Sequence, residues 1–517
     1  MKKRKGLLRI ADVIADMKEY PDAAFSALLS ALVMGLGQLR NKQKAKAAMF
    51  FGIFLAFLIL EVATSGYWYA AGEIARYPAA AGEKLYFFRD YGGLLTSGIW
   101  GLLTLGKVPG QTAYRGQTVE TFHRILPWLS ADNSVTLLGV GLIALVICSL
   151  LIVLWGFNVA DAYQTRKRYL KTGKQESVKA YFKRVWGSLF AYIMLVPSLV
   201  MVLFFILIPF LFSFLLAFTN YTYRLPIPNR LIQWVGFENF SKIVTDPGWF
   251  SIFAQVVGWT FLYATMASVT CYLAGMVQAL IIESKYVKFK KFWRSILIIP
   301  WAVPSMVSLM VFKNVFHKDG LANQLLYTTN LMEPVSNFLH QIGLQAIAEN
   351  PIFWFTSLGN GNLAKFIIIL VNLWLGSPYF MMLITGVLTT VPKDLYEAAS
   401  IDGASKWQSF KKITFPLIIQ ATIPAIIMTF TFNFNGFGSI YFLTGGGPRW
   451  ANVPNSMKVM GGIPGQTDIL ISWIYKLSFD RNAQLYNIAA VYSILIFVFI
   501  ASLSIYNLAK QKNLWED

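Results

Sequence analysis

The sequence is poor in the residues that build metal centres and disulfide frameworks. It contains only two cysteines and three histidines in 517 residues. Cys148 and Cys271 each lie inside an apolar run, and the histidines at positions 123, 317 and 340 are far apart in the chain. We therefore expect no disulfide framework, no metal site and no bound cofactor.

Charged residues are also scarce. They make up 14% of the chain, whereas soluble proteins carry about 25%. Hydrophobic residues make up 56%, aromatic residues 16%, and the mean hydropathy is +0.52. A protein core cannot bury so much apolar surface, so this composition argues against a soluble globular enzyme and predicts contact with lipid.

Long apolar runs account for this composition. Each has roughly 20 residues or more, enough to cross a bilayer, and in lipid each must be a helix. The chain is therefore predicted to be an all-α polytopic membrane protein with about eight transmembrane helices. The runs cover residues 47–70, 134–158, 188–219, 250–282, 293–313, 364–390, 415–443 and 487–509. A shorter run over 23–37 is predicted to be an interfacial or re-entrant helix.

The basic residues predict the orientation. The net charge is +20, but the lysines and arginines lie between apolar runs, so a nucleic-acid partner is not expected. With the N-terminus inside, 29 of the 45 basic residues lie inside and 16 outside, which predicts cytoplasmic termini in the cell membrane. The basic segment Thr165–Arg184 is then a cytoplasmic linker or amphipathic helix. The basic start is followed by acids such as Asp12 and Asp16, so no cleavable signal is expected.

The spans contain almost no ionisable groups that could drive transport. Apart from Glu61, near the outer end of the first span, no Asp, Glu, Lys, Arg or His lies well inside any of the eight, whereas proton-coupled transporters place such groups at membrane depth. The chain also lacks the G-x-x-x-x-G-K-[ST] phosphate loop, because Gly106 and Gly173 precede lysines that no Ser or Thr follows. If ATP drives this protein, a separate ATPase subunit must bind it.

The cytoplasmic segment between the sixth and seventh spans is predicted to form two short helices joined at Gly403. Asp394 is a suitable N-cap, and Glu397 three residues later would complete a capping box. Gly403 would end the first helix, and Ala404–Lys412 would form the second. Ala398 and Ala399 are small enough for a partner's backbone to approach closely.

This segment resembles the EAA loop of the membrane subunits of binding-protein-dependent ABC importers. The similarity covers roughly residues 250–510 and implies a type-1 permease core, preceded by a core-flanking part over 186–249 and a membrane extension over 1–185. In that family the loop, here 392–416, is the coupling helix that contacts the ATPase subunit. The matching positions are Glu397, Ala398, Ala399, Gly403, Ile413 and Pro416, while Phe415 replaces the usual leucine.

Two further stretches, Asn372–Phe380 and Thr429–Pro448, resemble the maltose/maltodextrin permeases of the MalF type. MalF of Gram-negative bacteria has a large periplasmic domain after its third span, whereas Asn220–Trp249 is only about 30 residues long. Residues 1–185 share only their hydrophobic character with that family. The resemblance implies sugar contacts at Leu375, Gly376, Tyr379, Thr429, Phe432, Asn433, Gly436 and Gly438.

Helical periodicity points to the same spans. At 100° per residue, one face of the seventh span carries a polar and aromatic stripe. Such a face suits a sugar, because a ring covers its CH groups and an amide pairs with its hydroxyls. Ordinary helix packing is the alternative interpretation of these residues. The stripe consists of Thr429, Phe432, Asn433, Gly436 and Ile440.

These observations predict a transport subunit rather than an enzyme, with no catalytic residues. We expect it to translocate maltose, maltodextrin or a similar oligosaccharide. The resemblance implies a second, MalG-like permease, two ATPase subunits and an extracellular solute-binding protein as partners. The alternatives are another oligosaccharide cargo or an ATPase-independent secondary transporter. A membrane-embedded enzyme is disfavoured because no histidines, cysteines or paired carboxylates cluster at one membrane level.

Overall fold

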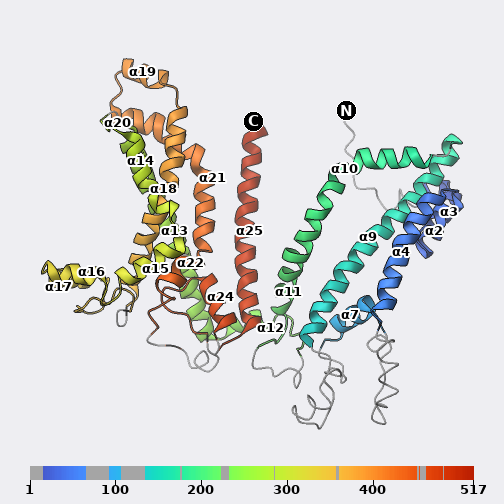
Figure 1. Cartoon of the computed structure of the whole chain (residues 1–517), viewed down its shortest axis with the longest axis horizontal. Helices are drawn as coiled ribbons and strands as arrows, with labels where there is room; N and C mark the ends of the chain where they lie inside the picture. The colour runs from blue at the N-terminus through green and yellow to red at the C-terminus, as the bar shows by residue number, and fades with distance from the viewer. Residues whose placement is uncertain are drawn as a thin grey trace, which may run out of the picture. The chain divides into compact units, whose positions relative to one another are not determined.

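The computed structural model describes residues 16–65, 92–105, 134–174, 177–222, 232–284, 286–356, 360–450, 453, 462–480 and 483–516. Within these ranges the regular structure is helical apart from isolated bridge residues, among them the pair Arg449 and Gly465, which confirms the all-α prediction. The chain forms two compact units (Figure 1). Unit 1 comprises Met1–Leu215 and Leu225–Trp234, and unit 2 comprises Leu216–Arg224 and Val235–Asp517.

The described residues contain seven helical stretches long and apolar enough to cross a membrane, or up to eight if one bent pair counts as a span. This confirms the predicted number. The first three are α4 (Lys44–Ala63), α9 (Ser134–Thr172) and the continuous stretch α10–η2–α11 (Val178–Val202, Leu203–Leu207, Ile208–Leu216). The others are α13 (Pro247–Glu283), α18 (Asn362–Thr390), α20–η3–α21 (Lys406–Ser409, Phe410–Thr414, Phe415–Phe434) and α25 (Tyr486–Glu516).

Two predicted spans are interrupted. The fifth consists of α14 (Lys290–Ala302) and α15 (Ser305–Val315), which meet at 87°. The break has a local cause, because Val303 precedes Pro304 and adopts an extended conformation. The seventh ends at Phe434, and α22 (Phe437–Leu443) begins after Gly436. The prediction of one continuous helix over 415–443 is therefore wrong.

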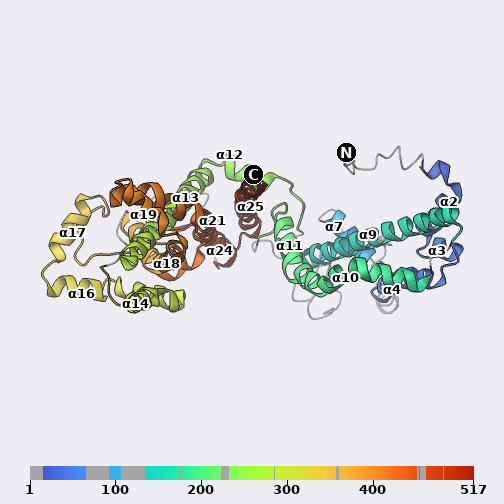
Figure 2. The same cartoon turned by 90° about the horizontal axis from the view of Figure 1, so that it is seen from above.

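Unit 1 packs short helices against α9. Helix α2 (Pro21–Leu32) and helix α7 (Leu94–Leu103) both lie along it, and α3 (Leu36–Arg40) follows α2 (Figures 1 and 2). With 12 residues, α2 is about 18 Å long, too short to cross a bilayer core of about 30 Å. The sequence between the first two predicted spans, 71–133, is expected to be external, and most of it lies outside the described residues.

The single carboxylate noted within a span caps a helix. Glu61 lies near the end of α4, and its carboxylate accepts hydrogen bonds from the backbone N–H groups of Gly93 at 2.9 Å and Leu95 at 2.8 Å. These groups lie at the N-terminus of α7, where a negative charge is stabilising. Glu61 thus has a structural role in unit 1.

The basic segment Thr165–Arg184 is a helix end and a helix start rather than one linker. Helix α9 continues to Thr172, and α10 begins at Val178. The Ser177 side chain caps α10 by accepting a hydrogen bond from the backbone N–H of Ala180 at 3.2 Å.

Unit 2 is built on the close pairing of α13 with α18. A Cβ atom at Gly275 of α13 would lie 2.5 Å from the Cβ of Phe380 on α18, so the absence of a side chain permits this approach. The other short helices of unit 2 are α12 (Glu238–Thr245), α16 (Leu321–Thr328), α17 (Met332–Gln341), α19 (Asp394–Ile401) and α24 (Leu470–Phe479).

Candidate functional site

A pocket of about 640 Å³ lies within unit 2, where several helical segments meet. Its walls come from the break between α14 and α15, from α18, from the end of α21 and from the start of α22. All eight predicted contact residues line it: Leu375, Gly376, Tyr379, Thr429, Phe432, Asn433, Gly436 and Gly438. The structure thus brings them together, while their role in binding stays a prediction.

The lining is aromatic and uncharged. Phe432 is 76% exposed and Trp301 is 59% exposed, so both ring surfaces are open to a ligand. The Trp301 ring centroid of α14 lies 6.1 Å from that of Tyr379 on α18, so two aromatic rings from different helices lie next to each other. None of the residues that line this pocket is an Asp, Glu, Lys, Arg or His. Such a lining suits a neutral ligand with apolar faces.

The amide of Asn433 is held within the wall. Its side chain is 3% exposed, and its Nδ2 donates to the Ser268 hydroxyl on α13 at 3.0 Å. Its Oδ1 accepts from Asn372 Nδ2 on α18 at 3.5 Å. Asn433 therefore joins three helices at the level of the pocket, and half-buried Asn372 is the more accessible amide.

Gly376 combines contact with the pocket and helix packing. A Cβ atom there would lie 2.7 Å from the sulfur of Cys271, closer than real Cβ contacts come. Gly376 therefore lets α18 approach α13. Gly376 therefore also contributes to the site by setting the positions of Leu375 and Tyr379 on α18.

The predicted stripe on the seventh span is only partly correct. Because α21 ends at Phe434, the helix face that carries Thr429 and Phe432 does not continue into α22. Ile440 is fully buried and packs in a core cluster that includes Trp259 and Leu443. Gly436 reaches the pocket because it lies in the break itself.

Sequence reasoning missed several lining residues. Trp301, Ser305, Asn372 and Met428 all face the pocket. Trp301 lies between Pro300 and Pro304, and this closely spaced proline pair was the signal for a broken helix with exposed rings. Asn372 begins a stretch already recognised as family-like, but only its later residues were assigned to the site.

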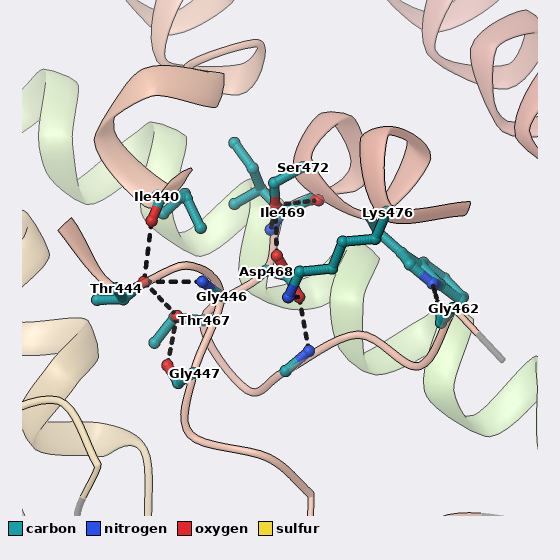
Figure 3. A network of polar contacts seen from close by, with 12 residues as sticks. Ile440, Thr444, Gly446, Gly447, Gly462, Thr467, Asp468, Ile469, Ser472 and Lys476 are labelled. Atoms are coloured by element: carbon teal, nitrogen blue, oxygen red, sulfur yellow. Dashed lines mark hydrogen bonds and ion pairs between the residues drawn. The ribbon is translucent and has the colours of Figure 1, made fainter. Parts of the chain in front are cut away.

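A polar network fixes the wall formed by α22 (Figure 3). Thr444, just after α22, lies 2.9 Å hydroxyl to hydroxyl from Thr467, and Thr467 donates to the carbonyl of Gly447 at 2.6 Å. The carboxylate of Asp468 is fully buried and pairs with the Lys476 ammonium of α24 at 2.5 Å. A Cβ atom at Gly446 would lie 2.2 Å from that carboxylate, so the ion pair requires a glycine there.

The same network reaches α13. The indole N–H of Trp259 donates to the carbonyl of Thr467 at 3.0 Å, and the hydroxyl of Thr260 accepts from the backbone N–H of Leu470 at 3.0 Å. Helices α13, α22 and α24 are thereby tied together at the end of unit 2 that lies opposite α19 (Figure 1).

The predicted coupling segment projects from unit 2 as an exposed helix. Helix α19 has no buried residue, and its last residue, Ile401, is 87% exposed. It ends as predicted at Gly403, whose φ is +75°. The backbone N–H of Ala404 donates to Ala399 at 2.9 Å and that of Gly403 to Ser400 at 3.1 Å, which is a Schellman motif.

The predicted capping box at Asp394 is wrong. Lys393 already adopts helical angles as the N-cap, so Asp394 is the first helical residue, and α19 has no side-chain cap. A capping box does form at the next helix, where Ser405 and Gln408 exchange side-chain and backbone hydrogen bonds at 3.2 and 2.7 Å. The second helix begins at Lys406 rather than Ala404 and continues through the π-helix η3 into α21.

Comparison with known proteins identifies the architecture. The family described as the binding-protein-dependent transport system inner membrane component matches residues 271–512. GanP, the galactooligosaccharides transport system permease protein of Bacillus subtilis, is 35% identical over 493 residues, which cover 95% of this chain and 98% of GanP. The chain belongs to this family.

Two further relatives of this permease refine the comparison. MalC, the maltodextrin transport system permease protein of Streptococcus pneumoniae, is 32% identical over 490 residues, covering 94% of this chain and 95% of MalC. MalF, the maltose/maltodextrin permease protein of Yersinia pestis, is 36% identical over 279 residues, covering 54% of this chain and 48% of MalF. The predicted resemblance to MalF-type permeases is confirmed.

The permease is thus a multi-pass protein of the cell membrane and a transport component rather than an enzyme. The similarity to GanP covers almost the whole chain and therefore includes most of residues 1–185, where the sequence motifs indicated no family.

Proposed function

We propose that this permease carries an oligosaccharide of the maltodextrin or galactooligosaccharide class through the pocket between α18 and α21. The observation that supports it most is the lining itself: exposed aromatic rings, neutral polar groups and no charge. GanP and MalC are named for galactooligosaccharides and maltodextrin. An uncharged lining argues against an acidic sugar, whose carboxylates would favour arginine or lysine partners.

In this proposal the rings of Phe432, Trp301 and Tyr379 cover the apolar faces of the sugar. Asn372, Ser305 and Thr429 pair with its hydroxyls, and Asn433 holds Asn372 in place. The sugar enters when the pocket opens outward and leaves when it opens inward, so the protein needs two conformations with different affinities for its partners. The aromatic contacts tolerate sugars of more than one length.

The energy comes from partner subunits. We propose that α19 docks on an ATPase subunit through Glu397, Ala398 and Ala399, with Gly403 setting the turn that follows. Ile413 lies in η3 and Pro416 at the start of α21, so the two helical elements leading from α19 would transmit its movement to the pocket wall. A second permease, two ATPase subunits and a solute-binding protein complete the transporter.

Reconstitution tests this assignment. Vesicles with this permease, its partner permease, the ATPase and the binding protein should accumulate radiolabelled oligosaccharide only when ATP is supplied on the ATPase side. The isolated chain should hydrolyse no ATP. Uptake by the chain alone, without ATP, would instead identify a secondary transporter.

The orientation is a separate proposal. The excess of basic residues inside, 29 against 16, places both termini and α19 in the cytoplasm. A cysteine introduced at the exposed Ser405 in intact cells should react only with reagents that cross the membrane. Rapid labelling by an impermeant reagent from outside would invert the topology and remove α19 from the ATPase side.

The size of the pocket predicts the cargo length. A Cβ atom at Gly438 would make only an ordinary contact with the ring of Phe442, at 3.7 Å, and we expect Gly438→Val to fill part of the pocket. We expect uptake of oligosaccharides to fall at least about tenfold more than uptake of a disaccharide, because one misplaced contact costs about 1 to 3 kcal/mol. Competition uptake with sugars of graded length measures this.

The matched control is Gly258→Val on α13. Gly258 is exposed and does not line the pocket, and a Cβ atom added there would have no neighbouring atom within 4 Å. Equal changes in length preference for both variants would show that added helix bulk, rather than pocket volume, sets the selectivity.

A further inference from the structure

A second pocket lies in unit 1 and is strongly basic. It has a volume of about 380 Å³, and none of its lining residues is an aspartate or glutamate. We call it the basic pocket. It is lined by Arg40, Asn41, Lys42, Thr165, Arg166, Arg168, Tyr169 and Lys174.

Two turns bring the lysines to the rim of the basic pocket. Lys42 lies in the turn between α3 and α4 and adopts a positive φ of 58°. Lys174 follows Gly173, which ends α9 with a φ of +64°. Both lysine side chains are exposed, and no ion pair in the described structure involves either of them.

One half-buried carboxylate, that of Asp22, orients the two arginines. Asp22 of α2 pairs with Arg40 and with Arg166, whose Nε donates to Asp22 Oδ2 at 2.6 Å. The hydrogen bond from Arg166 holds the pKa of Asp22 below its usual value, so the carboxylate stays ionised and the guanidinium groups stay in place. A single negative charge is shared by two arginines, which leaves the pocket with an excess of positive charge.

The wall of the basic pocket beside the two arginines is also held in place. Asn41 donates from Nδ2 to the carbonyl of Ala162 on α9 at 3.0 Å. In the same part of unit 1, the buried ammonium of Lys46 pairs with Asp161 at 3.1 Å. The basic pocket is therefore a preorganised site on packed helices rather than a group of mobile surface side chains.

Apolar surface begins at the rim. The Arg40 guanidinium lies 4.6 Å from the ring centroid of Phe25, which is 50% exposed. Leu28 and Leu32 continue this exposed apolar face along α2, and Phe157 of α9 is 66% exposed. Since α4 and α9 are long and apolar enough to cross a membrane and their polar ends meet here, we infer that the basic pocket lies at the level of lipid headgroups.

We propose that the basic pocket binds a phosphate group, and that the adjoining apolar face makes an anionic phospholipid its source. Guanidinium forks match phosphate oxygens, lysine ammonium groups add attraction, and acyl chains would cover the exposed side chains of α2. This site is separate from the proposed sugar pocket, because all its residues belong to unit 1.

Lipid titration of the purified full-length chain tests this. Native mass spectrometry would follow binding of dioctanoyl-phosphatidylglycerol, with dioctanoyl-phosphatidylcholine as the uncharged comparison. We expect Lys42→Gln combined with Lys174→Gln to weaken phosphatidylglycerol binding about 25-fold, since each lysine contributes about fivefold at an anionic headgroup. Both lysines are exposed, so the double variant should fold like the parent.

The matched control is Lys179→Gln combined with Lys183→Gln, which removes the same charge from exposed positions of α10 outside the basic pocket. It should bind the lipid within about twofold of the parent. A parallel titration with inorganic phosphate distinguishes the sources: phosphate binding as tight as that of the lipid, and equally sensitive to Lys42 and Lys174, would assign the pocket to a soluble anion. Equal losses in both double variants, or equal binding of phosphatidylcholine, would overturn the proposal.

Discussion

Ala398→Trp is expected to abolish oligosaccharide uptake and the stimulation of ATP hydrolysis, with a loss of at least about 100-fold in transport. Helix α19 buries none of its residues and Ala398 is exposed, so the substitution replaces no core contact of the permease. The substitution places a large ring where the backbone of the ATPase subunit should approach the methyl group of Ala398. A steric clash at such an interface costs several kcal/mol. Uptake and ATPase rates of the reconstituted transporter measure the effect.

Lys288→Trp provides the comparison. Lys288 is exposed in the turn between α13 and α14, and neighbouring Tyr286 lies beside the coupling segment, with its ring 6.0 Å from the ammonium of Lys406. A tryptophan there adds the same bulk to the same end of unit 2 and should leave ATPase stimulation within about twofold of normal. Wild-type transport by the Ala398→Trp variant would show that α19 is a solvated connection.

Phe432→Ala should reduce the apparent affinity for the oligosaccharide about 5- to 150-fold, because a stacking ring contributes about 1 to 3 kcal/mol. ATP hydrolysis stimulated by the binding protein should persist, since Phe432 is 76% exposed and supports no packing around α19. Radiolabelled uptake at graded sugar concentrations, measured together with the ATPase rate, separates affinity from coupling.

Phe430→Ala is the control for that variant. Phe430 lies on the same helix and packs on Phe434 with ring centroids 6.0 Å apart, but it does not line the pocket. It tests how much uptake depends on the stability of α21 alone. If Phe430→Ala impairs affinity as strongly as Phe432→Ala, the sugar does not stack on Phe432.

Hydropathy predicted where the spans lie because lipid imposes a length and a composition on each of them. It did not predict the breaks at Val303 and Gly436, because both lie within continuous apolar sequence and depend on backbone conformation. The proline at 304 was a usable local signal, whereas Asn435 and Gly436 resemble many helix-interior residues of membrane proteins.

The capping error has a similar origin. Asp394 to Glu397 and Ser405 to Gln408 both fit the pattern of a polar cap followed three residues later by Glu or Gln. Only the second forms a capping box, because Lys393 has already entered the helical conformation before Asp394. The spacing of residues in the sequence cannot show that the residue before the expected N-cap already has helical backbone angles.

The pocket residues came from the family resemblance more than from periodicity. The helical stripe included Ile440, which is buried in the core, and omitted Trp301, which belongs to a different helix. Contacts between elements distant in sequence, such as Asn433 with Ser268, depend on the packing of α13 against α21 and leave no pattern within either segment.

We expect the α22 side of the pocket to move least. The Thr467 hydroxyl contacts Thr444 just after α22, the Thr467 carbonyl accepts from Trp259 of α13, and the ion pair of Asp468 and Lys476 fixes the start of α24. The α14–α15 corner at Val303 and Pro304, close to Trp301, is then the part that we expect to move. We expect the sugar to be released when this corner swings its tryptophan away from Tyr379, while the opposite face keeps its shape.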